Sequence, residues 1–264
     1  MPRQENMNSL YAESFKRFLD ATNEKDAISD ALSKGALKNG DTILDIGAGN
    51  GELAGKLIER YKPSRYVGIE LNKAFRDPLA ALGVEVISES YPKANTHLGD
   101  TQFGTVLSSY SVPLTNPSRL DSVHRAFERT RENDGTMAIV SFAGQDQWST
   151  IAGEINDLIG DSIPDEEPAG QPTVADFTEA LQEEFADLGH VEASIFTSEI
   201  DGGSIDGLFH SIAFIATAGM KAALKEYYQS KQAVMTTLET HAPSGSITQS
   251  HSLVTISRKA PHVS

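Results

Sequence analysis

The chain has 264 residues and a formal net charge of −15, from 22 Lys and Arg against 37 Asp and Glu. Such an acidic chain disfavours nucleic acid as a substrate and suits small amine or cationic ligands better, although the charge can also serve solubility alone. No stretch approaches the roughly 18 apolar residues of a membrane span, and the polar start lacks a signal-peptide apolar region. We therefore expect a cytoplasmic protein with no membrane partner. The absence of cysteine excludes disulfides and thiolate metal sites.

The first part of the chain predicts two helices followed by an alternation of strands and helices. The helices cover residues 8–21 and about 24–38, and the alternation begins at residue 42. Pro78 argues against a clean helix over 73–82. Because the crossovers are long enough for parallel pairing, we expect an open sheet covered by helices. The predicted strands are 42–47, 65–70, 84–88, 103–110 and 135–142, and the predicted helices between them are 50–61, 73–82 and 118–131.

The second half of the chain is less regular. A proline-rich acidic stretch over 162–172 predicts a loop. The predicted fold is one Rossmann-like α/β domain, with about seven strands, helices on both faces and an added helical substrate cap. Its parts are an N-terminal helical cap (1–39), a cofactor-binding core (40–145) and substrate-side helices with the final strands (146–264). The remaining predicted helices are 146–160, 173–189, 205–218 and 220–240, and the remaining strands are 190–200 and 247–259.

A glycine-rich motif between the first strand and its helix is the strongest functional signal. The segment Asp45-Ile-Gly47-Ala-Gly49-Asn-Gly51-Glu52 lets the backbone turn sharply and lets a ligand approach closely. A dinucleotide-binding loop has its third glycine one position later, where this chain has Glu52. An acidic side chain there sits badly beside a pyrophosphate but suits the sulfonium and amino group of S-adenosylmethionine (SAM).

Polar residues at the ends of the following strands complete the predicted cofactor site. Glu70 lies 19 residues past Gly51 and is positioned to accept hydrogen bonds from both ribose hydroxyls. Glu89 and Ser90 follow the third strand and could flank the adenine, or be ordinary loop residues. The full predicted set of cofactor residues is Asp45, Gly47, Gly49, Gly51, Glu70, Glu89, Ser90 and Ser109.

Residues 40–145 resemble the class I SAM-dependent methyltransferases through this motif. The ends of the chain are similar to the histamine N-methyltransferase family: Tyr11, Ser14-Phe15, Arg17-Phe18-Leu19 and Thr22 with Glu24 match its N-terminal helix. Gln249 before Ser252-Leu-Val-Thr-Ile256 resembles its closing strand, and Asp146 to Trp148 lies where the family has a Gly-Trp pair.

The resemblance implies roles for single residues of the substrate site. Tyr11 and Phe15 would form an apolar lid, Glu24 would bind the amine end of the substrate, and Gln249 would replace the family's Asn. Tyr110 aligns with the family's Gln after the fourth strand, and Ser111-Val-Pro113 replaces its aromatic pair, so imidazole recognition is not expected. The predicted substrate residues are Tyr11, Phe15, Glu24, Tyr110, Trp148 and Gln249, with Glu24 and Tyr110 as the catalytic pair.

The predicted function is therefore methyl transfer from SAM to a small molecule, at an amine nitrogen. A C-methyltransferase for a 2-oxo acid stays open, with Arg119, Arg125 and the scattered histidines as its only candidates. A SAM-binding module without catalysis also stays open. An NAD-linked oxidoreductase is opposed by Glu52. No metal is predicted, because the seven histidines show no ligand spacing.

Overall fold

The computed structural model describes residues 2–111, 120–144, 146–159, 174–217 and 221–259. The chain forms two compact units, each assembled from three segments. Unit 1 comprises Met1–Glu24, Gly144–Gly170 and Thr197–Ser250, and unit 2 comprises Lys25–Ala143, Gln171–Phe196 and His251–Ser264.

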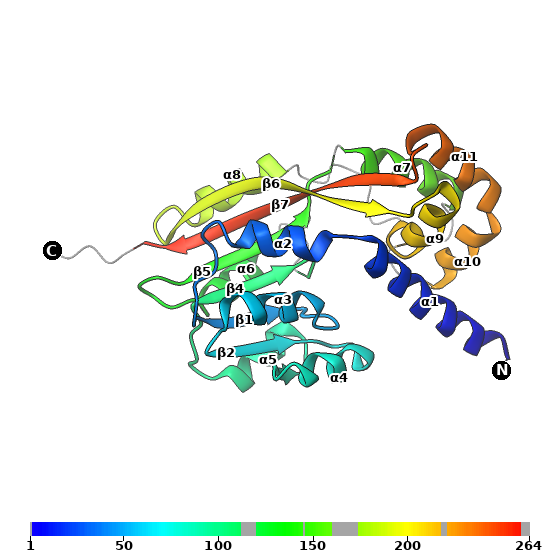
Figure 1. The fold of residues 1–264 in the computed structure, drawn as a ribbon. Helices are drawn as coiled ribbons and strands as arrows, with labels where there is room; N and C mark the ends of the chain where they lie inside the picture. Colours follow the sequence, from blue (N-terminus) through cyan, green and yellow to red (C-terminus); the bar gives the residue numbers. More distant parts are fainter. Residues whose placement is uncertain (1, 112–119, 145, 160–173, 218–220, 260–264) are drawn as a thin grey trace. The chain divides into compact units, whose positions relative to one another are not determined.

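A seven-stranded sheet, in the order β3-β2-β1-β4-β5-β7-β6, is the main feature of the fold (Figure 1). The first five strands are parallel and β7 runs antiparallel to β5, with Val140 opposite Leu253. The order reverses between β1 and β4, and ligands of open α/β sheets bind at such a switch point. The predicted Rossmann-like sheet of seven strands is confirmed. The strands are β1 (Thr42–Ile46), β2 (Arg65–Ile69), β3 (Glu85–Ile87), β4 (Thr105–Ser109), β5 (Thr136–Phe142), β6 (Gly189–Asp201) and β7 (Ser246–Arg258).

The helices of unit 2 cover both faces of its part of the sheet. Successive strand residues point to opposite faces, so Leu44 packs in one hydrophobic cluster and its neighbour Ile43 in the other. Both clusters are buried, which explains why the strands read as nearly continuous apolar runs. One face is covered by α2 (Glu24–Leu32), α3 (Glu52–Tyr61) and α4 (Lys73–Ala81), and the other by α5 (Tyr91–Leu98), α6 (Leu120–Phe127) and α8 (Val174–Glu184).

Unit 1 is built mainly of helices around a hydrophobic cluster of its own. Phe18, Trp148 and Phe209 belong to this cluster, and the Tyr227 hydroxyl donates a hydrogen bond of 2.7 Å to the Phe209 carbonyl. The Ser204 side chain caps the start of one helix by accepting from the Gly207 N–H at 3.0 Å. These helices are α1 (Pro2–Ala21), α7 (Gln147–Ile159), α9 (Ile205–Ala216), α10 (Lys221–Gln229) and α11 (Lys231–His241).

Three of the helical predictions differ from the structure, and one predicted helix forms despite the proline that argued against it. Helix α5 was not predicted, because Tyr91–Leu98 is too polar to show a clear apolar face. Helix α4 forms despite Pro78, since the Asn72 side chain caps its start through the Ala74 N–H. Helix α2 ends at Leu32 rather than near residue 38, and the expected helix over 220–240 is two helices. The predicted loop over 162–172 lies outside the described residues.

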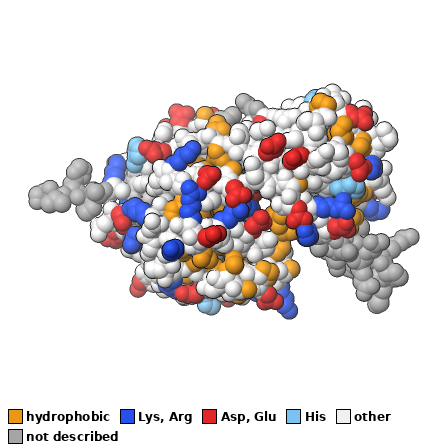
Figure 2. Space-filling view, in the orientation of Figure 1, with side chains coloured by type: hydrophobic (Ala, Val, Ile, Leu, Met, Phe, Trp, Pro, Cys, Tyr) orange, Lys and Arg blue, Asp and Glu red, His pale blue; other side chains and the backbone are white. Residues whose placement is uncertain are grey.

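The surface carries both signs of charge. Figure 2 shows acidic and basic side chains interspersed on the face drawn. Among the residues described, no helix has the length and apolar character needed to cross a membrane.

Candidate functional site

The loop between β1 and α3 in unit 2 has a backbone that requires glycine. Gly47, Gly49 and Gly51 all have positive φ angles, of 77°, 61° and 87°. A Cβ on Gly47 would lie 1.8 Å from the Ser111 hydroxyl oxygen, so the loop packs directly against the end of β4. Among the described residues, nothing lies within 4 Å of a Cβ built on Gly49. The middle of the loop is therefore open for a ligand to approach the backbone.

Glu70, at the end of β2, binds this loop directly. One carboxylate oxygen accepts a hydrogen bond of 2.8 Å from the Gly49 N–H, and the other accepts one of 2.6 Å from the Asn72 N–H. The side chain is only 9% exposed. Glu70 and the glycine loop, both predicted to bind the cofactor, are therefore in contact in unit 2. The ribose contact of Glu70 stays a prediction.

Asp45, at the carboxyl end of β1, is a buried carboxylate. Its Oδ2 accepts a hydrogen bond of 2.8 Å from the Tyr66 hydroxyl, and its Oδ1 has no hydrogen-bond partner among the described residues. Burial raises the pKa of Asp45 to about 6, against the lowering effects of the Tyr66 bond and the Lys25 charge. Tyr66 was not predicted as a site residue. It comes one strand later in the chain, and a tyrosine inside an apolar strand gives no signal of its partner.

The other predicted cofactor residues of unit 2 differ in their surroundings. Ser109, the last residue of β4, has a buried hydroxyl without a hydrogen-bond partner in the described part of the chain. Glu89 is partly exposed, and its Oε1 lies 3.1 Å from His97 Nε2. Ser90 precedes α5, and its carbonyl accepts the first hydrogen bonds of that helix. Ser109 therefore has unused hydrogen-bonding capacity at the end of β4.

Tyr110 follows β4 and is held by an aromatic cluster within unit 2. Its φ of 56° is unusual for a residue other than glycine. The hydroxyl lies 2.7 Å from His251 Nδ1, the ring stacks on Phe142 at 4.7 Å between centroids, and Lys25 Nζ lies 5.5 Å from the ring centroid. His251 is fully buried. Phe142 and Lys25 were not predicted as site residues, and His251 was a candidate only as one of the histidines of the C-methyltransferase alternative.

Glu24 in unit 1 is placed by a short pairing of the chain before it with the end of β6. Thr22 forms a β-bridge with Ile200, and the Asn23 side chain accepts a hydrogen bond of 2.8 Å from the Glu199 N–H. Glu24 is 2% exposed. A glutamate is seldom so buried without a specific reason, which fits a binding role.

Gln249, in the unit 1 part of β7, is fully buried. Within the described ranges, neither its amide oxygen nor its amide nitrogen has a hydrogen-bond partner. The neighbouring backbone is fixed, because the Thr248 N–H donates to the Gln147 side chain at 2.9 Å and the Ser250 N–H donates to Asp146. A buried amide with no partner is costly, so Gln249 is a strong candidate for a ligand contact.

Two further predicted substrate residues, Trp148 and Phe15, lie in or beside the hydrophobic cluster of unit 1. Trp148 is 8% exposed within that cluster, and the Phe15 ring lies 4.7 Å from the Phe214 ring. Tyr11 lies in α1, and its side chain is outside the described part of the structure. Packing accounts for Trp148 and Phe15, and their substrate roles stay predictions.

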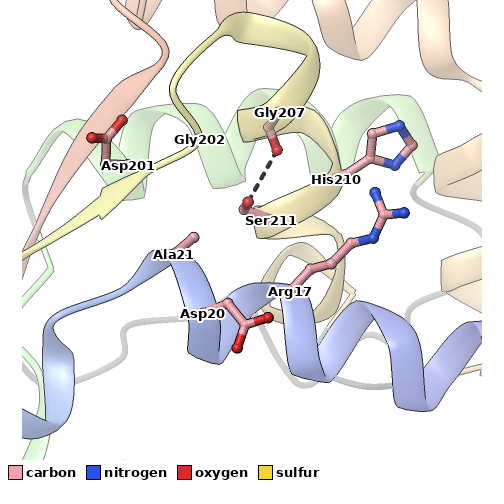
Figure 3. A pocket seen from close by; sticks show the side chains of 8 residues that line it. All are labelled: Arg17, Asp20, Ala21, Asp201, Gly202, Gly207, His210 and Ser211. Atoms are coloured by element: carbon pink, nitrogen blue, oxygen red, sulfur yellow. Dashed lines mark hydrogen bonds between the residues drawn. The ribbon is translucent and has the colours of Figure 1, made fainter.

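A small hollow of about 290 Å³ in unit 1 was not predicted from the sequence. It lies between α1 and α9, with Arg17 and Asp20 on one side and His210 on the other (Figure 3). Burial lowers the pKa of His210, and the Arg17 charge adds to that effect. Charged side chains of both signs line the hollow.

Two histidines of unit 1 have separate acidic partners. His241 lies 2.7 Å from a Glu154 oxygen, and His210 lies 3.9 Å from an Asp206 oxygen. Where the chain is described, no three histidine, aspartate or glutamate side chains form a group that could hold a metal ion.

Comparison with known proteins shows likeness at the level of structure. No family model and no curated protein sequence matches the chain. Among solved structures, the YcgJ protein of Bacillus subtilis is 13% identical, with 88% of this chain and 98% of that chain covered and a TM-score of 0.54. The cyclopropane synthase MmaA2 of Mycobacterium tuberculosis is 17% identical, with 87% and 82% covered and a TM-score of 0.52.

A third similar structure is that of a predicted methyltransferase. This protein, BH2331 of Bacillus halodurans C-125, is 12% identical, with 87% of this chain and 97% of that chain covered and a TM-score of 0.53. At these identities the likeness shows a shared fold. The chain thus shares the Rossmann-like α/β fold of these three structures.

Proposed function

We propose that this chain is a SAM-dependent methyltransferase that transfers a methyl group to an amine nitrogen of a small molecule. The observation that carries the proposal is the open glycine loop whose Gly49 N–H is bound by the Glu70 carboxylate. The shared fold with a predicted methyltransferase supports the same reaction class. The acidic chain, with its net charge of −15, suits a cationic cofactor and an amine substrate.

The residues around the loop fit SAM. Bound SAM would supply a methyl group on a sulfonium sulfur, and the neutral thioether left behind is a good leaving group. Asp45 and Glu52 provide negative charge at the loop, and Glu70 offers carboxylate oxygens to ribose hydroxyls. The unpartnered Ser109 hydroxyl and the open backbone at Gly49 offer further polar contacts. A pyrophosphate would meet these carboxylates unfavourably, which argues against a dinucleotide.

Methyl transfer requires an acceptor atom that is oriented toward the methyl group and has a free lone pair, and it requires a site from which water is excluded. Tyr110 orients the acceptor at the end of β4. Glu24 holds an ammonium or accepts a proton from it, and Gln249 uses its buried amide as a polar contact. Phe15 and Trp148, with Tyr11, supply apolar surface. These acceptor roles rest on the resemblance to the histamine N-methyltransferase family and on the burial of the individual side chains.

Methyl transfer can be tested directly by mass spectrometry. The purified full chain is incubated with methyl-labelled SAM and a pool of small amines, amino acids and 2-oxo acids. A labelled amine supports the proposal, whereas a labelled 2-oxo acid replaces it with C-methylation. SAM binding without any labelled product would contradict catalysis on these classes and favour a binding module. The Gly49→Val variant is the matched negative control, since it fills the open space over the loop.

A further inference from the structure

We propose that the hollow between α1 and α9 in unit 1 binds a small zwitterion that carries both a carboxylate and an ammonium, as a free α-amino acid does. Its volume of about 290 Å³ is at the lower end of the roughly 300–1,000 Å³ of small-molecule sites, so the ligand is small. All the residues that line the hollow belong to unit 1. The site is therefore complete within that unit, and it does not depend on the proposed methyl transfer.

One wall of the hollow is built from backbone that requires glycine. A Cβ on Gly207 would lie 1.9 Å from the Gly202 carbonyl oxygen, and a Cβ on Gly202 would lie 2.1 Å from the Leu208 backbone nitrogen. The segment after β6 and the first turn of α9 therefore meet with no side chain between them. The Ser211 hydroxyl donates a hydrogen bond of 3.0 Å to the Gly207 carbonyl, as Figure 3 shows. These contacts fix the wall over which the charged side chains lie.

Arg17 and His210 form the end of the hollow that attracts an anion. Figure 3 shows the Arg17 guanidinium beside the His210 ring, although the two side chains come from different helices. Burial lowers the pKa of His210, and the nearby Arg17 charge lowers it further. The packing of α1 on α9, which includes a contact of 4.7 Å between the Phe15 and Phe214 rings, holds the two groups near each other. A carboxylate bound at this end would offset the repulsion between them.

Both of these side chains have N–H donors to offer. Arg17 donates from Nη2 to Glu13 at 2.7 Å, which uses one of the five donors of the guanidinium. Arg17 and Glu13 are exposed, and exposed ion pairs one helical turn apart are weak enough to give way to a ligand. His210 Nε2 lies 3.9 Å from Asp206 Oδ2, which is too far for a hydrogen bond. A carboxylate in the hollow can therefore accept hydrogen bonds from two directions.

Asp20 and Asp201 give the hollow its negative charge. Figure 3 shows Asp201 across the hollow from Arg17 and His210. One Asp201 oxygen accepts a hydrogen bond of 2.8 Å from the Gly203 N–H, which orients the side chain, and Asp20 pairs with the exposed Lys16. An anion alone would meet these carboxylates, and a cation alone would meet the guanidinium. A ligand with both charges is complementary to both ends.

Nuclear magnetic resonance of the full chain labelled with ¹⁵N-histidine tests the site without SAM. The His210 signals are identified by their loss in His210→Gln and are followed during titration with L-alanine. We expect saturable shifts with a Kd of roughly 1 to 10 mM, because open ion pairs are weak. Bound L-alanine should also raise the pKa of His210, since its carboxylate favours the imidazolium. The charges of the protein that already act on this imidazole are those of Arg17, Lys231, Asp206 and Glu13.

Propionate and ethylamine are the matched probes, because each lacks one of the two charges of L-alanine. Each should bind at least about tenfold more weakly than L-alanine, as expected when the hydrogen bonds to one charged group are lost. The proposal is overturned if L-alanine gives no saturable shift, or if either probe binds as tightly as L-alanine does.

Variants test the two ends of the hollow separately. Arg17→Gln and Asp201→Asn should each weaken L-alanine binding about tenfold. Both side chains are exposed, so the fold should be retained, and unchanged His241 signals would verify it. Lys225→Gln and Asp157→Asn make the same charge changes at exposed positions elsewhere in unit 1 and should have no effect. Equal weakening by these controls would indicate a general charge effect and refute the site.

The titration and the methyl-transfer assay can fail independently. A chain that methylates no amine but binds L-alanine in this way would keep the site and lose the proposed function. A chain that methylates an amine but shows no saturable L-alanine binding would keep the function and lose the site.

Discussion

Asp45→Asn tests whether the buried carboxylate at the end of β1 destabilises the folded chain. Burial raises the pKa of Asp45 from its ordinary 3.8 to about 6 in the folded chain. Because the folded-state pKa is the higher one, the stability linked to its proton is fully present below about pH 3.8 and is lost as the pH rises through about 6. The difference of about 2.2 between the two pKa values corresponds to about 3 kcal/mol of unfolding free energy.

Asparagine keeps an oxygen that can accept the Tyr66 hydroxyl but carries no charge. Asp45→Asn should therefore have a larger free energy of unfolding than the wild type above pH 6, by up to about 3 kcal/mol, and a much smaller difference near pH 4. The difference is measured by urea denaturation of both proteins between pH 4 and 8. Asp30→Asn, at an exposed carboxylate, is the control and should show no gain that grows with pH.

Two results would refute the reasoning about Asp45. The first is an Asp45→Asn variant no more stable than the wild type at pH 7, and the second is a stability difference that does not change with pH. If the gain is found together with weaker SAM binding, the carboxylate is retained for binding at the expense of stability, as is common at functional sites.

Three further variants test single residues. Glu70→Ala should weaken SAM binding by about 10- to 100-fold in a calorimetric titration, with Glu85→Ala as the unaffected control, and unchanged affinity would remove Glu70 from the site. Glu24→Gln should keep SAM affinity and lower amine turnover about tenfold or more, whereas Asp26→Asn should change neither; equal turnover would contradict the amine role. Gln249→Met should raise the free energy of unfolding by about 1 kcal/mol, because it removes an unpaired buried amide, and lower kcat/KM about tenfold. A destabilised variant would show that the folded chain already satisfies that amide.

The sheet could be predicted because its strands are buried on both faces. Thr42–Ile46 and Arg65–Ile69 are short apolar runs bounded by turns, and such runs identify strands without knowledge of their neighbours. The strand order could not be obtained in this way, because pairing joins segments far apart in the chain. Helix α5 escaped prediction since only a few of its residues are apolar.

The site residues differ in the same way: those linked by local spacing could be predicted, and those linked by long-range contacts could not. The glycine loop and Glu70 are linked by a standard strand–helix–strand spacing, so the sequence could indicate both. The hydrogen bond between Tyr110 and His251 joins residues 141 positions apart, and no local pattern reports it. The period-2 pattern of the last strand offered a partial signal, because the buried Gln249 and His251 are separated by the less buried Ser250.

The way the chain is divided between the two units has a consequence for its synthesis. Unit 1 draws on three separate segments, the last ending at Ser250, and unit 2 needs β7 residues that come after it. A nascent chain can therefore complete neither unit until almost all of it has left the ribosome, and many stabilising contacts are between residues distant in sequence. Fragments cut at Ala143 or Phe196 would leave apolar faces uncovered, so the full chain is the smallest piece worth expressing.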